Sequence, residues 1–138
     1  FAGKVDDDRL GRYYREARAL IFPSEEDFGM VAVEALASGT PVIAYEYGGI
    51  REILRVGETG EVFRSQTPEV IAEAVKRFIE KEAQGGYSPE TLIRSVETFS
   101  RVSFESGIRK AAGETEYGES SGSAASFKKD TSIFQAHK

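Results

Sequence analysis

The sequence predicts an α/β fold in which a parallel sheet carries helices on both faces. Two uninterrupted apolar runs, Leu20–Phe22 and Pro41–Tyr45, are predicted as buried strands, and the second is of the kind that is buried on both faces of a sheet. Helical patterns stand between the strand candidates, and this alternation implies right-handed crossovers between parallel strands. No internal repeat is visible in the chain.

The first part of the chain is predicted to alternate between strands and helices. Phe1–Val5 is a short strand candidate. Three aspartates at positions 6–8 then precede a helical pattern in which apolar residues recur near the 3.6-residue period (Leu10, Tyr13, Tyr14, Ala17, Ala19 and Leu20). After the strand Leu20–Phe22 a helix is predicted over about Gly29–Ser38, with Gly39 as its C-terminal stop.

The second part is predicted to hold one more strand, Glu61–Phe63, among several helices. Gly48-Gly49 turns into a short helix that precedes this strand. Thr67-Pro68-Glu69 opens an amphipathic helix, because proline is favourable at the first helical position. Two further helices are predicted, one from Ser88 to about Phe99 and one over Arg101–Ala112.

The composition excludes several classes of function. The 138-residue chain has 18 basic and 23 acidic residues, and its net charge of −5 argues against a nucleic-acid binder, which would show a basic face. The chain contains no cysteine, which excludes disulfides, thiolate nucleophiles and cysteine-ligated zinc. The single histidine, His137, lies at the end of a mostly polar tail and is a poor candidate for a catalytic triad.

The two ends of the chain differ from its middle. No apolar run approaches the roughly 20 residues needed to cross a bilayer, and no signal-peptide pattern opens the chain. Because the chain starts without methionine, at what is predicted as the end of a strand, we expect a fragment of a longer protein. From Gly113 the sequence is rich in Ser, Gly, Glu and Lys, and we expect residues 113–138 to be disordered or loosely attached.

The most informative segment runs from Pro23 to Ala44. Glu26 lies in the loop before a predicted helix, and Glu34 follows with seven residues between them. The first amides of a helix attract phosphate, and a glycine such as Gly29 lets a ligand approach the backbone closely. Glu34 would lie about 6–7 Å along the helix axis from these amides, near the distance between a nucleotide's phosphate and its ribose hydroxyls. Since carboxylates accept hydrogen bonds from hydroxyls, the segment suits a sugar nucleotide.

The same acids also have plainer interpretations. Glu25, Glu26 and Asp27 are of the kind favoured before a helix, with Asp27 as a cap, and Glu34 could be a solvated helix residue. The aspartates at 6–8 could form a D-x-D metal motif, although acids before a helical stripe usually serve as cap and first turn. The order of strand, acidic loop, helix and second strand favours a ligand site, because parallel sheets bind ligands beyond the carboxyl ends of their strands.

Residues 1–112 resemble the second half of the C-terminal domain of retaining glycosyltransferases of family 4 (glycosyl transferases group 1), which have two Rossmann-like domains, the GT-B fold. Glu26 and Glu34 match the family's E-x7-E motif. Further matches are Phe1–Val5 with the segment before the base-binding loop, Gly48-Gly49-Ile50-Arg51-Glu52 with a Gly-Gly-x-x-Glu turn, Thr59-Gly60 with a Thr-Gly turn, and Phe99-Ser100 with the start of the closing helices. The central run most resembles bacterial and archaeal mannosyltransferases that use GDP-mannose.

The resemblance implies how the transferred sugar is bound. Glu26 and the backbone amides of Phe28, Gly29 and Met30 would hold the sugar hydroxyls, and Glu26 is the catalytic candidate. The resemblance implies no cofactor and no metal ion, because positive charge and helix ends stabilise the departing diphosphate in this family.

The resemblance also implies how the nucleotide is bound. The amides of Val31 and Ala32 would approach the diphosphate, Glu34 would bind the ribose, and the backbone near Lys4 and Val5 would contact the base. The family's diphosphate-binding Arg and Lys and its acceptor domain would lie upstream of residue 1. We therefore expect the fragment by itself not to catalyse transfer.

The function that the resemblance implies is retaining transfer of a hexosyl group, with mannose favoured, from a nucleoside-diphosphate sugar to a glycan or lipid-linked acceptor. Two alternatives remain open. One is a sugar-nucleotide epimerase of the same double-Rossmann plan. The other is a non-enzymatic phosphoacceptor or nucleotide-binding module, which Ser38–Ala44 resembles but which would need an aspartate where the strand before Pro23 ends.

We expect a donor-binding Rossmann-like segment over residues 1–86, closing helices over 87–112 and the tail over 113–138. The expected partners are the nucleotide sugar, the acceptor and the missing N-terminal domain of the same protein, without nucleic acid and without a transmembrane segment in this chain. The expected location is the cytoplasm, with contact to the inner membrane face made through the missing domain.

Overall fold

The computed structural model describes residues 2–111, apart from the side chains at 101, 104, 107, 110 and 111. In this part of the chain the elements follow in the order α1 (Asp7–Glu16), β1 (Leu20–Phe22), α2 (Met30–Ala37), β2 (Val42–Tyr45), α3 (Ile50–Ile53), β3 (Gly60–Phe63), α4 (Pro68–Ala83), α5 (Pro89–Ser95), a 3-10 turn (Glu97–Phe99) and α6 (Arg101–Ala111). The tail expected over 113–138, and the expected helix end at Ala112, lie outside the described residues.

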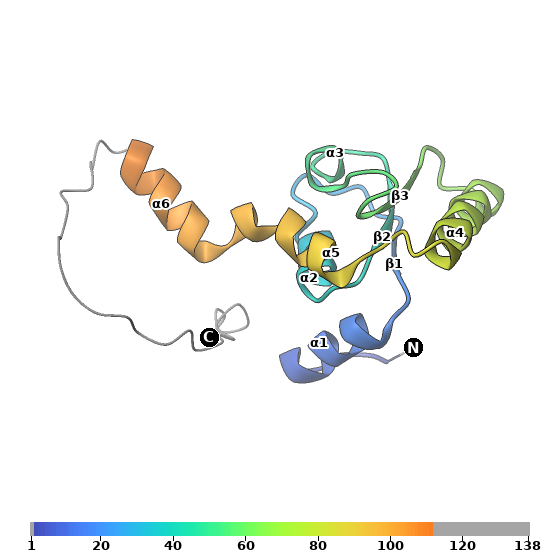
Figure 1. The fold of residues 1–138 in the computed structure, drawn as a ribbon, viewed down its shortest axis with the longest axis horizontal. Coiled ribbons are helices and arrows are strands. Elements are labelled where there is room, and N and C mark those ends of the chain that lie inside the picture. Colours follow the sequence, from blue (N-terminus) through green and yellow to red (C-terminus); the bar gives the residue numbers. More distant parts are fainter. Residues whose placement is uncertain (1, 112–138) are drawn as a thin grey trace. The chain divides into compact units, whose positions relative to one another are not determined.

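The three strands form one parallel sheet in the order β1–β2–β3. Leu20 lies opposite Val42, and Val42 lies opposite Gly60. α2 connects β1 to β2, and α3 connects β2 to β3 (Figure 1). The predicted α/β fold with parallel strands and intervening helices is confirmed.

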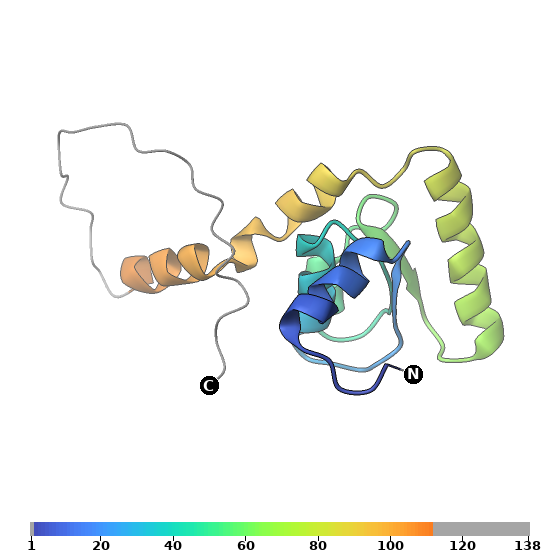
Figure 2. The same cartoon turned by 90° about the horizontal axis from the view of Figure 1, so that it is seen from below.

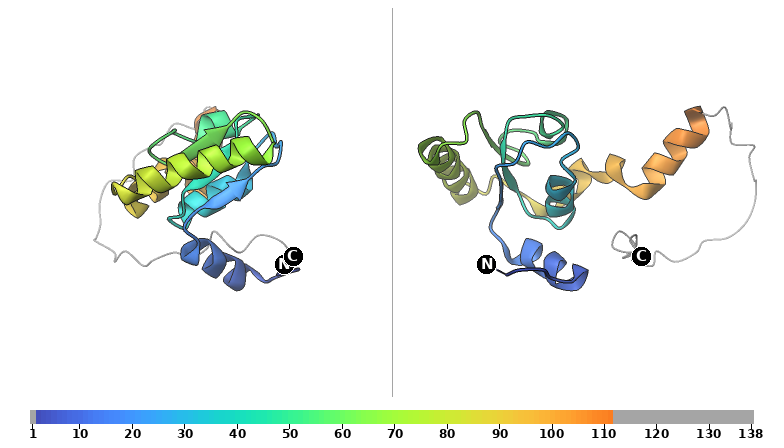
Figure 3. Two further views of the ribbon diagram at one scale, coloured as in Figure 1. Left: turned by 90° about the vertical axis from the view of Figure 1, so that its right-hand side faces the viewer. Right: turned by 180° about the vertical axis from the view of Figure 1, so that it is seen from behind.

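Helices cover both faces of the sheet, and β2 shows this most clearly. Val42 and Ala44 belong to a core cluster shared with α1, α2, α3 and α5, whereas Ile43 belongs to a second cluster shared with α4. These three side chains are at most 1% exposed. Figures 1 and 3 show α4 lying across the strands on the side opposite α2. The expectation that β2 is buried on both faces is therefore confirmed.

β1 is less covered than its three apolar residues predict. Leu20 and Phe22 pack against the cluster that includes α2, but Ile21 is 48% exposed. Ile21 lies beside Ile43 and so points to the α4 face, where α4 packs on β3 and β2. Coverage of a strand depends on where a distant helix lies, which the strand's own sequence does not specify.

The strand predicted over Phe1–Val5 is wrong for the described residues 2–5, which form no strand. Gly3 has a φ of +66°, a left-handed conformation that interrupts an extended chain. The apolar residues at this end gave the appearance of a strand. Nothing in the local sequence shows whether a neighbouring strand is present to pair with it.

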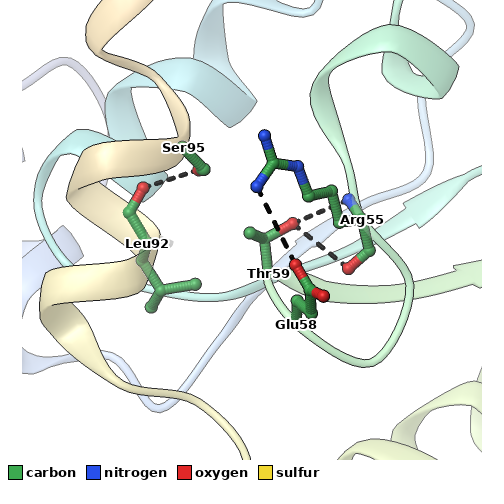
Figure 4. A network of polar contacts seen from close by, with 5 residues as sticks. All are labelled: Arg55, Glu58, Thr59, Leu92 and Ser95. Carbon is green, nitrogen blue, oxygen red and sulfur yellow. Dashed lines mark hydrogen bonds and ion pairs between the residues drawn. The ribbon is translucent and has the colours of Figure 1, made fainter.

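The helix predicted from Ser88 to about Phe99 is interrupted. α5 ends at Ser95, whose Oγ donates to the Leu92 carbonyl at 2.6 Å (Figure 4). A serine hydroxyl that bonds a carbonyl in the preceding turn competes with the helical ladder. The buried side chain of Val96 follows, and the chain then forms the 3-10 turn.

α6 belongs to a second compact unit that begins at Thr98, separate from the unit that ends at Glu97. On α6 the side chains of Val102 and Ile108 are exposed. Within residues 2–111, no helix combines the length and apolar character that a membrane span requires.

Candidate functional site

The loops that follow the three strands lie at one edge of the sheet, because the strands are parallel. Figure 2 shows the loop after β1 and the connection from β3 to α4 at the lower edge of this unit. The crevice beyond the carboxyl ends of the strands is the usual ligand position in open α/β sheets. The Glu26 loop and the start of α2 lie at this edge.

α2 begins without a side-chain cap. Its N-cap residue is Gly29, in the left-handed conformation with a φ of 62°, and no acidic residue occupies the first turn. The amides of Ala32 and Val33 donate to the Gly29 carbonyl at 2.9 and 3.2 Å. Within residues 2–111 the amides of Met30 and Val31 make no hydrogen bond. These two donors are available for a ligand at the positive end of the helix dipole.

This geometry revises two sequence interpretations. Asp27 does not cap α2, because the left-handed Gly29 takes the N-cap position and Asp27 lies two residues before it. The open side of Gly29 also does not face a ligand. A Cβ added there would lie 3.1 Å from the Cδ1 atoms of both Ile50 and Ile53. Gly29 is required by its positive φ and by the close packing of α3.

The Gly48-Gly49 turn supports the backbone of the Glu26 loop. A Cβ at Gly48 would lie 2.4 Å from the Glu26 carbonyl oxygen, and one at Gly49 would lie 2.4 Å from the Asp27 carbonyl oxygen. The Gln66 side-chain amide also holds this loop, because it donates to the Pro23 carbonyl at 2.6 Å. The glycine pair therefore acts through packing, since any side chain at these positions would displace the loop.

Glu26 itself is exposed at the tip of this supported loop. In the described part of the chain its carboxylate makes no hydrogen bond and no ion pair. Two apolar side chains stand beside it at the start of α2: Phe28 is 79% exposed and Met30 is 53% exposed. The loop thus presents an available acceptor and an apolar surface next to the two unbonded amides.

Glu34 lies one turn into α2 and is partly buried. Its Oε2 accepts a hydrogen bond from the hydroxyl of Tyr14 on α1 at 3.2 Å. Burial, followed by the charge of Glu34, raises the pKa of Tyr14 to about 12. Periodicity placed Tyr13 and Tyr14 in the core, which is correct for Tyr14, at 7% exposed, and wrong for Tyr13, at 39% exposed. Periodicity gave no signal for a partner 20 residues away.

Lys4 and Val5 lie in the segment that leads into α1, with Lys4 exposed and Val5 partly buried. The next residue, Asp6, caps α1 by accepting a hydrogen bond from the Arg9 amide at 2.8 Å. Asp7 and Asp8 occupy the first turn of α1. The cap and first-turn interpretation of these aspartates is confirmed. Residues 2–111 contain no group of three or more His, Cys, Asp or Glu side chains arranged to hold a metal ion.

The Thr59-Gly60 turn is structural. Thr59 is fully buried, and its Oγ1 accepts from the Arg55 amide at 2.9 Å and donates to the Arg55 carbonyl at 3.3 Å (Figure 4). A Cβ at Gly60 would lie 1.8 Å from the Val42 carbonyl oxygen. The threonine closes the turn, and the glycine permits the close approach that begins the β2–β3 pairing.

These features define an open, parallel α/β sheet whose Glu26 loop and uncapped α2 start lie at its carboxyl edge. The sequence profile of the family described as "Glycosyl transferases group 1" matches residues 1–94, and the chain belongs to this family. A solved structure of sucrose-phosphate synthase from Thermosynechococcus elongatus is similar with a TM-score of 0.69 and 30% identity, over 83% of this chain and 30% of that one. The expected fold class, part of the C-terminal domain of a GT-B fold, is thereby supported.

Curated relatives are similar over shorter stretches. A D-inositol 3-phosphate glycosyltransferase of Streptomyces griseus is 42% identical over 79 residues, which is 56% of this chain and 17% of the relative. An uncharacterised glycosyltransferase of Methanocaldococcus jannaschii is 39% identical over 80 residues, which is 57% of this chain and 20% of the relative. The chain spans less than a third of the length of each of these three proteins.

Proposed function

We propose that this chain forms part of the donor site of a retaining glycosyltransferase, which transfers a hexosyl group from a nucleoside-diphosphate sugar. The observation that carries the proposal is the start of α2, where two unbonded amides lie between the Glu26 loop and Glu34. Membership of the family supports glycosyl transfer. Because the matched part of the chain covers at most 30% of each of these relatives, the activity proposed is that of a longer protein.

In the proposed donor complex, the diphosphate lies at the amides of Met30 and Val31. Ala32, which the family pattern also assigns to the diphosphate, already donates its amide to Gly29, so the two preceding amides carry this contact. The positive end of the α2 dipole favours the negative charge there. Glu34, one turn further along the helix, accepts hydrogen bonds from the ribose hydroxyls, and the base lies toward Lys4 and Val5.

The transferred sugar lies on the other side of the diphosphate, at Glu26 and the backbone of Phe28 and Gly29. The exposed Glu26 carboxylate accepts hydrogen bonds from the sugar hydroxyls and places the anomeric carbon for transfer with retention. The proposal requires no metal ion, because the helix end and cationic groups of the missing N-terminal part neutralise the diphosphate. Adding EDTA to the full-length enzyme should leave its activity unchanged, whereas a metal-dependent transferase would stop.

The form of the central run favours mannose, carried by GDP, as the sugar. The names of two relatives refer to D-inositol 3-phosphate and to sucrose phosphate. We therefore propose that three classes of acceptor be assayed: glycans, lipid-linked saccharides and small phosphorylated compounds with free hydroxyls. We propose that the reaction takes place in the cytoplasm, and that the domain not contained in this chain selects the acceptor.

Donor binding to the full-length protein tests the proposal directly. GDP-mannose, UDP-glucose and UDP-N-acetylglucosamine are titrated by calorimetry against the wild type and against Glu34→Ala. We expect one of the three donors to bind clearly. The substitution should weaken its binding about tenfold or more, because hydrogen bonds to a charged carboxylate are lost.

Glu80→Ala is the matched control. Glu80 is an exposed glutamate on α4, the helix that covers the opposite face of the sheet, so its removal should leave donor affinity unchanged. If the wild type binds none of the three donors, the proposed donor site is wrong. If Glu34→Ala binds every donor as tightly as the wild type does, the ribose role of Glu34 is wrong.

A further inference from the structure

We infer that Tyr14 is a positioning residue that fixes the carboxylate of Glu34 in the orientation that receives the ribose. Tyr14 lies on α1, outside the segment from β1 to β2 that holds both glutamates. This role depends on the proposed donor site, because Glu34 must first be the residue that binds the ribose.

Tyr14 is held at its backbone and at its ring. Its carbonyl accepts a hydrogen bond from the hydroxyl of Thr40, a residue that is 1% exposed and follows α2. Its ring is 7% exposed and belongs to the core cluster formed with α2, α3 and α5. Because both the backbone and the ring of Tyr14 are held, its hydroxyl is kept in one position relative to α2.

The hydroxyl of Tyr14 donates to Glu34 Oε2 at 3.2 Å and so connects α1 to α2. An ionised carboxylate has two oxygens and about four sites that accept hydrogen bonds. One of these sites is taken by Tyr14, and the others remain for the two vicinal hydroxyls of a ribose. A tyrosine hydroxyl is protonated, and is therefore a hydrogen-bond donor, across the neutral pH range.

Removing the hydroxyl should therefore affect recognition of the ribose more than binding of the phosphates. A glutamate without this contact samples more side-chain conformations, and ordering it on binding lowers affinity by about two- to tenfold. A nucleotide that lacks the ribose hydroxyls makes no use of the ordered carboxylate. Its affinity should not change.

The experiment compares four forms of the full-length protein: wild type, Tyr14→Phe, Tyr13→Phe and Glu34→Ala. The probes are GDP and UDP together with their 2′,3′-dideoxy analogues. For the base that binds, the readout is the dissociation constant of the dideoxy analogue divided by that of the ordinary nucleotide. We expect Tyr14→Phe to lower this ratio by about two- to tenfold while the affinity for the dideoxy analogue stays the same. Glu34→Ala should bring the ratio close to one.

Tyr13→Phe controls for loss of a tyrosine hydroxyl on the same helix. Tyr13 is 39% exposed and accepts a hydrogen bond from Arg9 Nε at 2.9 Å, so its removal should leave the ratio at the wild-type value. The double variant Tyr14→Phe/Glu34→Ala should have the same ratio as Glu34→Ala alone, because Tyr14 acts only through Glu34.

The outcomes separate this inference from the proposed function. A ratio lowered by Glu34→Ala and unchanged by Tyr14→Phe overturns the positioning role and leaves the donor site intact. Equal weakening of both probes in Tyr14→Phe also overturns it, since that pattern indicates a general structural effect. A wild type that binds both forms of the nucleotide equally contradicts the ribose site itself, and with it the role of Tyr14.

Discussion

The helices α1 and α2 begin in opposite ways. Asp6 caps α1 through the Arg9 amide, and two more aspartates occupy its first turn. α2 begins at a left-handed Gly29 with no side-chain cap and no acid in its first turn. The chain itself neutralises the positive end of α1, whereas the first turn of α2 has no acid that would neutralise its positive end.

Packing explains how α2 tolerates an uncapped start. A glycine in place of a Ser, Thr, Asp or Asn cap costs a helix roughly a few tenths of a kcal/mol. On α2 the side chains of Ala32, Ala35 and Leu36 are fully buried, and fully burying a leucine alone contributes about 1.5–3 kcal/mol. By contrast, among the residues of α1 only Gly11 and Tyr14 are buried. The well-buried helix has an unneutralised start, whereas the more exposed helix is stabilised by its own side chains.

We expect the largest loss of stability at Gly48, which packs against the backbone of the loop that carries Glu26. In Gly48→Ala, the new Cβ would meet the Glu26 carbonyl oxygen, and the residue would keep a φ of +57°. We expect a loss of about 2–4 kcal/mol in the free energy of unfolding, from strain and overpacking together. Chemical denaturation measures this loss, and donor affinity should fall as the loop moves.

Gly57→Ala is the matched control for that substitution. Gly57 also has a positive φ, +79°, but a Cβ there would have nothing within 4 Å. It should therefore cost only the backbone strain, about 1 kcal/mol or slightly more. Equal losses in the two variants would show that the contact with the Glu26 loop contributes nothing.

Much of the fold could be predicted from the sequence, because its signals are local. The apolar run Val42–Tyr45 and the helix after Pro68 follow directly from strand and helix patterns, and both are present. Ile21 shows the limit, since its exposure depends on the position of α4. Gly3 shows a second limit, because its left-handed φ interrupts the segment Phe1–Val5, which resembles a strand in sequence.

The residues of the candidate site stand out in the sequence, whereas the backbone and the contacts that position them do not. Glu26 and Glu34 stand out by spacing, but acids at 6–8 and at 25–27 precede helices in the same manner. Only the backbone distinguishes them, because Gly29 moves the start of α2 beyond the reach of Asp27. The contact between Tyr14 and Glu34 joins positions 20 residues apart, and no local pattern reports such a pair.

The second largest effect is expected on donor affinity, when the charge beside the two unbonded amides of α2 is changed. Met30→Glu places an acid in the first turn of α2, and so gives this helix a feature that α1 already has. Since Met30 is 53% exposed, the substitution should leave stability the same or slightly higher. The new charge should repel the diphosphate and weaken donor binding by about ten- to a hundredfold.

Met30→Gln serves as the control for Met30→Glu, because it has the same size and no charge. It should retain most of the donor affinity, and added salt should recover part of the affinity that Met30→Glu loses. Isothermal titration of both variants at two salt concentrations makes the measurement. If the two variants bind equally well, the amides of α2 do not face the diphosphate.

The smallest effect is expected at α1, because its cap stabilises only this helix and has no part in the proposed donor site. Asp6→Ala removes the acceptor of the Arg9 amide and should lower the free energy of unfolding by about 1 kcal/mol. Asp7→Ala, which changes a first-turn acid without removing the cap, should lower it by no more than about 0.5 kcal/mol. Thermal melts of the two variants measure the difference. Because the start of α1 is neutralised by its own side chains, EDTA should not change the melting temperature of the wild type. A shift on adding EDTA would instead indicate that the aspartates bind a metal ion.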